Sequence, residues 1–382
     1  MTLSDIQSEE SRLREFPVAR TKVFLAHAGD CPLPKRVSDA IASYAERCCE
    51  GDQEQFVYPA VLAEGRQLGA SLLKCQPEEV SFVGPTSLGI SLVAAGLRFR
   101  KGDNILIYFD DYPSNVYPWM ALAEQGIEVR LMNTRSLGLI RPQDVVGQID
   151  ENTRLVALAS CHFISGYRIN LAAIGRALHD RNILFCVDGI QTLGAFPTTV
   201  EDVDFLAADA HKWLLGPCGA GILYVRKALH ASLNPPIYGW HNTRCPDFVA
   251  QERVEYRPGP QRFEAGTHNL LGLVGLVEAM RLLQEVGVEN IANDLLDKRS
   301  FLVPALQSKG YTVLQADTPP ENASGIVSFH RPSEDMSALQ QKLAANGIVT
   351  SLRTNRTKQN FIRLSPHFYN TQAELERVVG LL

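Results

Sequence analysis

Several polar side chains stand where apolar runs of the chain end. The run ILFCVD ends at Asp188, and the later run VDFLAADA is followed by the adjacent residues His211 and Lys212. A third run, SFVG, is followed by a proline and then by Thr86 and Ser87, where a helix is expected to begin. Burying a carboxylate or an ammonium group is costly unless it meets an opposite charge or is used covalently. These positions are therefore candidates for chemistry.

Each of these features has a simpler explanation when it is taken alone. Lys212 would mark the return of the chain to the surface, Asp188 would cap the next helix, and Thr86 would belong to an ordinary N-cap. In an open α/β sheet, however, ligands bind beyond the carboxyl ends of the strands. Pyridoxal phosphate (PLP) requires a lysine for its aldehyde, a carboxylate for its ring nitrogen and a helix N-terminus for its phosphate. The ordered set therefore predicts a PLP site.

The elements that carry these residues alternate between short β-rich runs and amphipathic helical stretches. Several of the β-rich runs are apolar throughout, which is typical of parallel strands covered on both faces. The expected strands are residues 80–83, 104–109, 128–132, 154–160, 183–187, 203–207 and 221–225. The expected helices between them are residues 88–98, 116–125, 141–149 and 171–181. This alternation predicts an α/β fold with one mostly parallel, seven-stranded sheet.

The pattern changes after this sheet. Residues 233–265 are rich in proline, arginine and aromatic residues and lack periodicity, so a long functional loop is expected there. A long helix is expected from residue 270 to about residue 286, followed by a mixture of helices and strands. We expect a large PLP-binding domain at 22–265, a connecting segment with the long helix at 266–287, and a smaller α+β domain at 288–382 that residues 1–21 join.

Composition and charge exclude several classes of protein. The chain has 382 residues, of which 45% are hydrophobic, and its formal net charge is −5, as in ordinary globular proteins. It contains no basic stripe of the kind that binds nucleic acid and no unbroken apolar run that would span a membrane. The eight cysteines lack metal-ligand spacing, and the polar N-terminus does not look like a signal peptide. We therefore expect a cytoplasmic protein with no metal site and no nucleic-acid or membrane partner.

The motifs at the strand ends resemble those of the class V aminotransferase family of fold-type I PLP enzymes, which includes cysteine desulfurases, kynureninases and isopenicillin-N-epimerase-like proteins. The family's Asp-x-x-Gln motif is present from Asp188 to Gln191, and its His-Lys pair is present at His211 and Lys212, followed by Gly-Pro-x-Gly. The resemblance covers the chain from about residue 22 to its end. It implies that Lys212 holds the cofactor as a Schiff base and that Asp188 pairs with the pyridine nitrogen. It also implies that Gln191 hydrogen-bonds the ring hydroxyl and that His211 contacts the phosphate or supports the lysine.

Further motifs extend the implied cofactor site. Thr86 and Ser87 match the family's phosphate loop, and DDYPSNVYPW resembles the segment that places an aromatic ring, here Tyr112, over the cofactor. FEAGTHN resembles the motif by which one subunit touches the phosphate bound to its neighbour. The resemblance therefore implies a homodimer in which Gly266 and Thr267 reach the neighbouring active site.

The resemblance also implies two substrate contacts and shows two departures. FIRLSPHFYNT makes Arg363 the expected clamp for the substrate α-carboxylate, and SCHFISGYRIN places His162 on the substrate side of the ring. The first departure is Asp209, which stands where members often have a phosphate-binding serine, so we expect its carboxylate to turn away or to meet a cation. The second is a missing thiol. Cysteine desulfurases carry a sulfur-accepting cysteine shortly before the final Arg motif, whereas the last cysteine here is Cys245.

The expected reaction is that of an aminotransferase-type enzyme on a small α-amino acid, through an external aldimine and a carbanion, with Lys212 as the general base. The alternative is a cysteine or cystine C–S lyase, which eliminates at Cβ without a persulfide cysteine. A second alternative is a non-catalytic PLP-binding regulatory or scaffold protein. Arginines of the long loop are candidates for binding a second acidic group of the substrate, namely Arg244, Arg253, Arg257 and Arg262.

Overall fold

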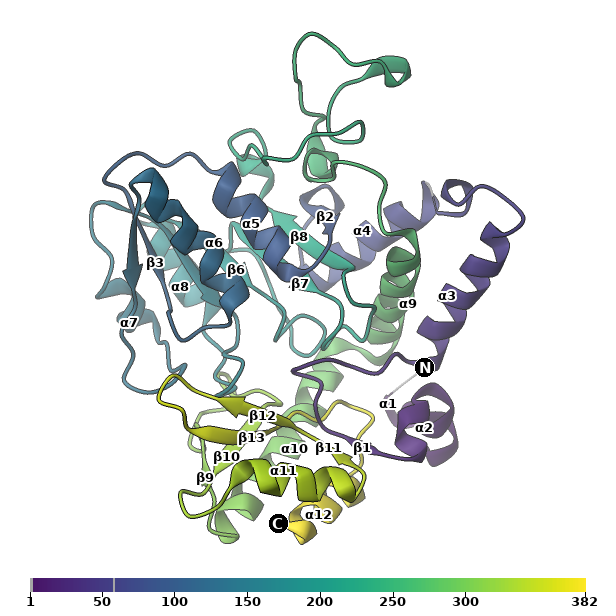
Figure 1. Cartoon of the computed structure of the whole chain (residues 1–382), viewed down its shortest axis with the longest axis vertical. Helices are drawn as coiled ribbons and strands as arrows, with labels where there is room; N and C mark the ends of the chain where they lie inside the picture. Colours follow the sequence, from purple (N-terminus) through teal and green to yellow (C-terminus); the bar gives the residue numbers. More distant parts are fainter. Residues whose placement is uncertain (1–2, 58) are drawn as a thin grey trace.

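The computed structural model describes residues 3–57 and 59–382. Its largest sheet has seven strands in the order β2-β8-β7-β6-β5-β3-β4 (Figure 1). The strands are β2 Val80–Val83, β3 Asn104–Ile107, β4 Glu128–Leu131, β5 Thr153–Ala159, β6 Leu184–Asp188, β7 Phe205–Asp209 and β8 Gly221–Val225. Strand β8 runs antiparallel to its neighbours β2 and β7, whereas β6 pairs in parallel with β5 and β7. The predicted mostly parallel seven-stranded sheet is confirmed.

The large sheet lies between two layers of helices because its strands are apolar on both faces. Successive residues of a strand point to opposite faces, so Leu155 of β5 packs in one apolar cluster and Val156 in the other. One face is covered by α5 Thr86–Gly96 and α6 Tyr117–Met120, and the other by α4 Ala60–Leu73, α8 Leu171–His179 and α9 Leu270–Val286. Two further helices are α3 Lys35–Cys48, which packs on α9, and α7 Pro142–Val146, which packs on α8.

A smaller unit with its own core lies below the large sheet in Figure 1, in yellow and pale green. It contains an antiparallel four-stranded sheet in the order β12-β13-β10-β9. Its elements are α10 Val288–Ser308, β9 Thr312–Val313, β10 Val327–His330, α11 Met336–Ala345, β11 Ile348–Val349, β12 Ser351–Thr354, β13 Asn360–Leu364 and α12 Gln372–Leu381. This is the kind of α+β structure expected for the C-terminal part of the chain. The domain limits drawn from the sequence stay predictions.

The N-terminal segment contacts the smaller unit. Helices α1 Leu3–Gln7 and α2 Glu9–Glu15 precede β1 Val23–Phe24, which pairs in parallel with β11. Arg12 of α2 lies 2.8 Å from Glu374 of α12, which ties the two ends of the chain together. Residues 23 and 24, at the start of the predicted large domain, thus pair with a strand of the smaller unit.

Residues 233–265 form a long loop that projects from the body at the top of Figure 1. Its regular structure consists of two short 3-10 turns, Pro246–Phe248 and Gly259–Phe263, and a bridge between Thr243 and Tyr256. The chain then returns to the body through α9, and α10 begins two residues after α9 ends. Within the residues that the structure describes, no helix is both long and apolar enough to cross a membrane.

Candidate active site

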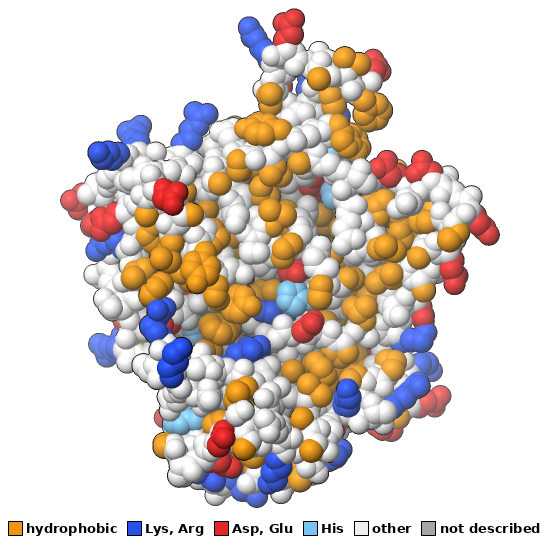
Figure 2. Space-filling view, viewed as in Figure 1, with side chains coloured by type: hydrophobic (Ala, Val, Ile, Leu, Met, Phe, Trp, Pro, Cys, Tyr) orange, Lys and Arg blue, Asp and Glu red, His pale blue; other side chains and the backbone are white. Residues whose placement is uncertain are grey.

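Strands β6 and β7 bring Asp188 and Lys212 to one edge of the large sheet. Asp188 is the last residue of β6 and pairs with Ala207 of β7, and Lys212 follows shortly after β7 ends at Asp209. Both side chains are buried. Figure 2 shows Lys or Arg, Asp or Glu, and His side chains gathered in the hollow between the large sheet and the smaller unit. Lys212 and Asp188, which were predicted to lie at neighbouring strand ends, are close enough to interact electrostatically.

Burial and charge determine the protonation of this pair. The pKa of Lys212 is lowered to about 8, mainly by burial. The charge of Asp188 opposes this lowering, whereas the charges of Arg363 and Arg353 add to it. Burial also raises the pKa of Asp188, although an Ile190 N–H bond of 3.0 Å and the charge of Lys212 oppose that rise. An amine whose pKa is close to 8 is partly unprotonated near neutral pH. Lys212 is therefore suited to act as a nucleophile and as a base.

Tyr112 lies beside Lys212. The Lys212 Nζ is 5.2 Å from the centroid of the Tyr112 ring. The same ring makes an edge-to-face contact with Phe163, with 5.4 Å between the centroids. Tyr112 is otherwise exposed, so its ring borders the open space next to the lysine. The stacking role of Tyr112 stays a prediction, and its aromatic neighbour Phe163 was not predicted from the sequence.

Two arginines from the antiparallel hairpin of the smaller unit face the same region. Arg363 is buried, with Nη1 2.6 Å from the Phe163 carbonyl and Nη2 3.4 Å from Ser351 Oγ, while its Nε has no partner. Arg353 lies close to Arg363. The Nη2 atoms of Arg353 and Arg363 are 3.1 and 3.3 Å from the same point, the position that a Cβ on Gly29 would occupy. Burial, and then the charge of Arg353, lowers the pKa of Arg363. Within the described residues neither guanidinium pairs with a carboxylate, which is the arrangement an anionic substrate group requires.

The start of α5 and the end of β7 meet where a phosphate is predicted. Thr86 is the first residue of α5, and its Oγ1 accepts a 2.9 Å hydrogen bond from the Asp209 N–H. The first N–H groups of a helix lack partners within the helix and suit an anion. The Asp209 carboxylate turns to His211, whose Nδ1 lies 2.7 Å from Oδ2. Asp209 therefore meets a histidine, whereas its relation to a bound phosphate stays a prediction.

Two predicted contact residues have most of their polar groups engaged within the protein. Gln191 donates through Nε2 to the Ala28 carbonyl at 3.0 Å and accepts at Oε1 from Trp213 Nε1 at 2.9 Å. One amide N–H of Gln191 remains for a ring hydroxyl. His162 is bound at Nδ1 by Ser165, with Nε2 3.0 Å from a backbone carbonyl, and burial lowers its pKa to about 4. His162 is therefore neutral, and its predicted substrate contact would have to be made by the face or a C–H edge of the ring.

A second buried carboxylate, Asp111, lies near Asp188 and was not predicted from the sequence. Asp111 accepts hydrogen bonds from the Tyr112 N–H at 2.7 Å, Asn115 Nδ2 at 3.1 Å and the Ala159 N–H at 3.0 Å. Ala159 is the strand partner of Asp188. Burial, and then the charge of Asp188, raises the pKa of Asp111 to about 7. Its only signal in the sequence was its place in DDYPSN, directly before Tyr112.

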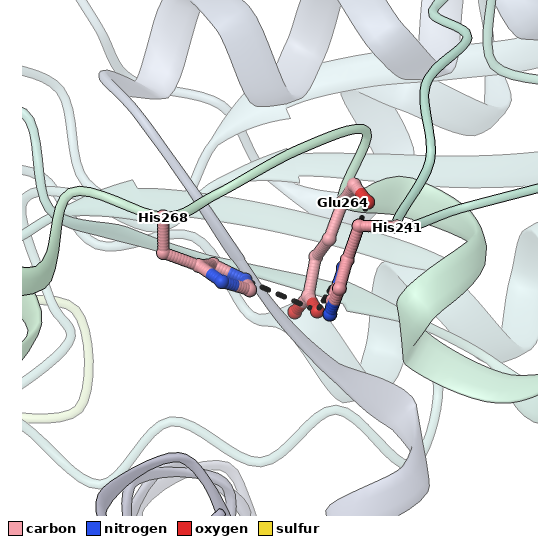
Figure 3. Close-up of side chains that lie close together, drawn as sticks. All are labelled: His241, Glu264 and His268. Carbon is pink, nitrogen blue, oxygen red and sulfur yellow. Dashed lines mark hydrogen bonds and ion pairs between the residues drawn. The ribbon is translucent and has the colours of Figure 1, made fainter. Parts of the chain in front are cut away.

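Figure 3 shows a separate cluster in which Glu264 lies between His241 and His268. His268 Nε2 is 3.2 Å from Glu264 Oε2, and His241 Nδ1 is 3.0 Å from the Glu264 carbonyl. The same carboxylate is held by Arg66, whose Nη2 lies 2.7 and 2.6 Å from its two oxygens, and by the Phe82 N–H at 2.8 Å. A guanidinium in contact with both oxygens opposes binding of a metal cation. The cluster therefore anchors the segment that leads to Gly266 and Thr267.

The Gly266-Thr267 segment lies on the surface beside the predicted phosphate position. Thr267 is exposed, with Oγ1 3.3 Å from Glu54 Oε1, and a Cβ at Gly266 would meet no atom within 4 Å. A cavity of about 330 Å³ opens here, lined in part by Gly84, Leu88 and Thr267. Neither Lys212 nor Asp188 lines this cavity. Gly266 and Thr267 are therefore accessible to a second subunit, and the subunit contact itself stays a prediction.

Taken together, the donor groups fit PLP. A buried lysine and a buried carboxylate lie at the ends of neighbouring strands, and a helix N-terminus begins nearby. The partnerless Nε of the buried Arg363 shows that the site has unused capacity to bind an anion. PLP and an amino-acid carboxylate would satisfy these groups together.

Known proteins resemble this chain over nearly its whole length. A sequence profile described as "Aminotransferase class-V" matches residues 23–378. The chain is 29% identical to a probable cysteine desulfurase of Methanothermobacter thermautotrophicus, over 97% of this chain and 96% of that protein. A cysteine desulfurase structure from Thermococcus onnurineus has the same fold, with a TM-score of 0.90 at 24% identity, over 98% of this chain and 96% of that one. The structure of the cystine C-S lyase C-DES in complex with its product cysteine persulfide has a TM-score of 0.86 at 26% identity, over 96% of this chain and 98% of that one.

The fold and the site define a PLP-dependent enzyme of fold type I. The chain belongs to the class V aminotransferase family, because the family profile covers nearly its whole length. The predicted family, fold class, enzymatic nature and cofactor are thereby confirmed. The family contains both transferases and lyases, so membership alone does not decide the reaction.

Proposed function

We propose that the protein is a C–S lyase that cleaves cysteine or cystine by β-elimination. With cysteine, the Cα–H and Cβ–S bonds break, and uptake of one water molecule yields pyruvate, sulfide and ammonia. PLP, when bound, supplies a ring that withdraws the negative charge left at Cα. The relatives are named as desulfurases and a C-S lyase, which favours this reaction over the aminotransferase-type reaction that the sequence placed first.

Lys212 and Asp188 perform the proton and charge steps in this proposal. Lys212 holds the cofactor and, once released, removes the substrate Cα proton at Nζ. Its pKa of about 8, lowered by burial, leaves enough unprotonated amine near neutral pH for this task. Asp188 would pair with the ring nitrogen of the cofactor and favour its protonated form, because a buried carboxylate attracts a cation strongly. Tyr112, beside Lys212, would contact the ring.

The arginines orient the substrate. Arg363 binds the α-carboxylate, because its guanidinium faces the site and lacks a carboxylate partner among the described residues. Arg353, adjacent to Arg363, adds a second positive charge that suits the distal carboxylate of cystine. Three of the four loop arginines proposed for this task make contacts within the loop and its base: Arg244 pairs with Glu255 at 3.4 Å, and the Nε atoms of Arg257 and Arg262 donate to backbone carbonyls at 3.2 and 2.9 Å. Arg353 therefore replaces them in our assignment.

The observation that carries the proposal is the lack of a thiol where desulfurases need one. The β12–β13 connection, residues 355–359, has the sequence NRTKQ, and no cysteine follows Cys245. Arg356 in this connection is held by Asp110, with Nε 2.6 Å from Oδ1, and stacks on Phe109 at 3.7 Å. Without an acceptor thiol in this connection, the sulfur leaves with the product instead of being stored on the protein.

We further propose that the enzyme is a homodimer in which Gly266 and Thr267 complete the phosphate site of the partner subunit. Thr86, Ser87, His211 and Gln191 would hold the cofactor from within the subunit. Large apolar side chains near the exposed Thr267 support a subunit contact, because Leu88 and Leu271 are both exposed. Sedimentation equilibrium of the wild-type protein and of Leu271→Asp tests this point.

The test of the reaction is product analysis with the purified holoenzyme. Cysteine, cystine, alanine and glutamate are added singly, and pyruvate, sulfide, persulfide and alanine are measured over time. We expect many turnovers of pyruvate with sulfide from cysteine, or with persulfide from cystine. Alanine formed from cysteine would indicate a desulfurase, and keto acid formed only in stoichiometric amount would indicate a transaminase. Binding of PLP without any product would indicate a non-catalytic role, and Lys212→Ala serves as the inactive control.

A further inference from the structure

Phe163 lies in the segment that joins β5 to α8 and contacts the aromatic side of the active site. Its ring makes an edge-to-face contact with Tyr112, with 5.4 Å between the centroids and 77° between the planes. The Tyr112 ring in turn lies 5.2 Å from Lys212 Nζ. Phe163 is partly exposed, whereas its neighbours in the chain, His162 and Ile164, are buried. Phe163 is therefore accessible beside Tyr112.

The backbone of Phe163 reaches the other end of the site. Its carbonyl oxygen accepts a 2.6 Å hydrogen bond from Arg363 Nη1. In the proposed function, the substrate amine is at Lys212 and the α-carboxylate is at Arg363, so Cα and Cβ lie between these two groups. Phe163 contacts Arg363 at one end of this span and Tyr112, beside Lys212, at the other. It therefore borders the space that the substrate occupies.

The segment that carries Phe163 is fixed by contacts that do not involve its ring. Ser328 Oγ donates to the Ile164 carbonyl at 2.5 Å, and Ser324 Oγ donates to the Gly166 carbonyl at 2.7 Å. Both serines belong to the smaller unit, so the segment is held between the two parts of the chain. The Phe163 ring thus has a defined position while part of its surface stays available to a ligand.

A sulfur atom on the substrate Cβ suits such a surface. Divalent sulfur is polarisable and makes favourable contacts with aromatic rings, often at the ring edge. A hydroxyl group placed there would lose water without gaining a hydrogen-bond partner from the ring.

We propose that Phe163 is a specificity-determining residue whose ring contacts the sulfur atom bound to the substrate Cβ. The ring favours sulfur amino acids over substrates of the same shape that carry carbon or oxygen at this position. This inference rests on the proposed function and deepens it, because the proposed function assigns residues to the amine and the carboxylates but none to the sulfur.

The experiment compares two acids that bind without reacting. In 3-(methylthio)propionate the sulfur is as many bonds from the carboxylate as in cysteine, and pentanoate has a methylene group in its place. Neither acid has an amino group, so neither displaces Lys212 from the cofactor. Dissociation constants of both acids are measured by isothermal titration calorimetry of the holoenzyme. The ratio of thioether to pentanoate affinity should fall by about 2- to 12-fold in Phe163→Leu, because leucine keeps an apolar surface but loses the aromatic ring.

Two further variants serve as controls. Phe163→Tyr keeps an aromatic ring and should keep the wild-type ratio. Phe24 of β1 is a matched control, because it is also partly buried and its ring lies 5.0 Å from that of a buried histidine, His27, much as the Phe163 ring lies 5.1 Å from that of His162. Phe24→Leu should leave the ratio unchanged.

Equal losses of affinity for the two acids in Phe163→Leu, or a ratio that does not change, would overturn the role of Phe163. An absence of pyruvate when the wild-type holoenzyme is given cysteine or cystine would instead refute the proposed function. The two failures are distinguishable because the affinity ratio is measured without turnover.

Discussion

The Arg66–Glu264 pair gives the sharpest stability prediction. The Glu264 side chain is 0% exposed and that of Arg66 14%, with Nη2 of Arg66 2.7 and 2.6 Å from the two carboxylate oxygens. Arg66→Met removes the guanidinium and leaves the carboxylate with the Phe82 N–H and His268. Breaking a buried ion pair on one side costs about 3–5 kcal/mol. Because Arg66 keeps some access to solvent, we expect a loss close to about 3 kcal/mol, at the lower end of that range.

The loss is measured by urea unfolding of the holoenzyme, with hydrogen exchange of residues 264–268 as a local readout. Burial raises the pKa of Glu264, but the interactions with His268 and Arg66 and the Phe82 N–H outweigh it and lower the pKa. A carboxyl with a lowered pKa in the folded state stabilises the protein above its unfolded pKa of about 4.3. That stabilisation is lost as the pH falls through the folded value. The difference between wild type and Arg66→Met should therefore be full at pH 7 and shrink below about pH 4.

Two controls separate an orphaned charge from a lost contact. Arg281→Met breaks an exposed pair with Glu64, whose side chains are 42% and 39% exposed, and should cost only about 0–1 kcal/mol. The double variant Arg66→Met with Glu264→Gln removes the orphaned charge and should be more stable than Arg66→Met alone. If Arg66→Met cost no more than Arg281→Met at pH 7, Glu264 would not depend on Arg66, and the anchoring role of the cluster would be refuted.

The remaining predictions concern the active site. Lys212→Ala should abolish turnover and the visible band of bound cofactor, and normal turnover would contradict the assignment of Lys212. With cofactor-stripped protein, the rate at which that band appears on adding PLP should rise with pH, with a midpoint at about 8, because burial lowers the pKa of Lys212 and the unprotonated amine reacts. Asp188→Asn should move this midpoint lower, because the Asp188 carboxylate raises the pKa of Lys212. A midpoint near 10 for the wild-type protein would show that the amine is not desolvated. Arg363→Lys should reduce kcat/KM by about 10- to 100-fold, since a charged hydrogen bond to the substrate is weakened, and an unchanged kcat/KM would remove Arg363 from substrate binding.

The large sheet and the strand ends that carry the central chemistry could be predicted from the sequence alone. Apolar runs, glycine turns and helical periodicity are local signals, so the seven strands were predicted close to their observed positions. Asp188 and Lys212 followed from the rule that parallel strands share one carboxyl edge. Polar residues at the ends of buried runs were sufficient to indicate PLP chemistry.

Which side chains are free to act at the site depends on contacts that form only in the folded protein. Gln191 is largely taken up by Trp213 and Ala28, and Arg353 comes next to Arg363 across the β12–β13 hairpin. These contacts join segments far apart in the chain, and no local pattern encodes them. The charge balance of the site arises in the same way, since the ionisation of Asp209 depends on N–H groups that a later turn brings to it. Burial and distance, which set the pKa values, exist only once the chain has folded.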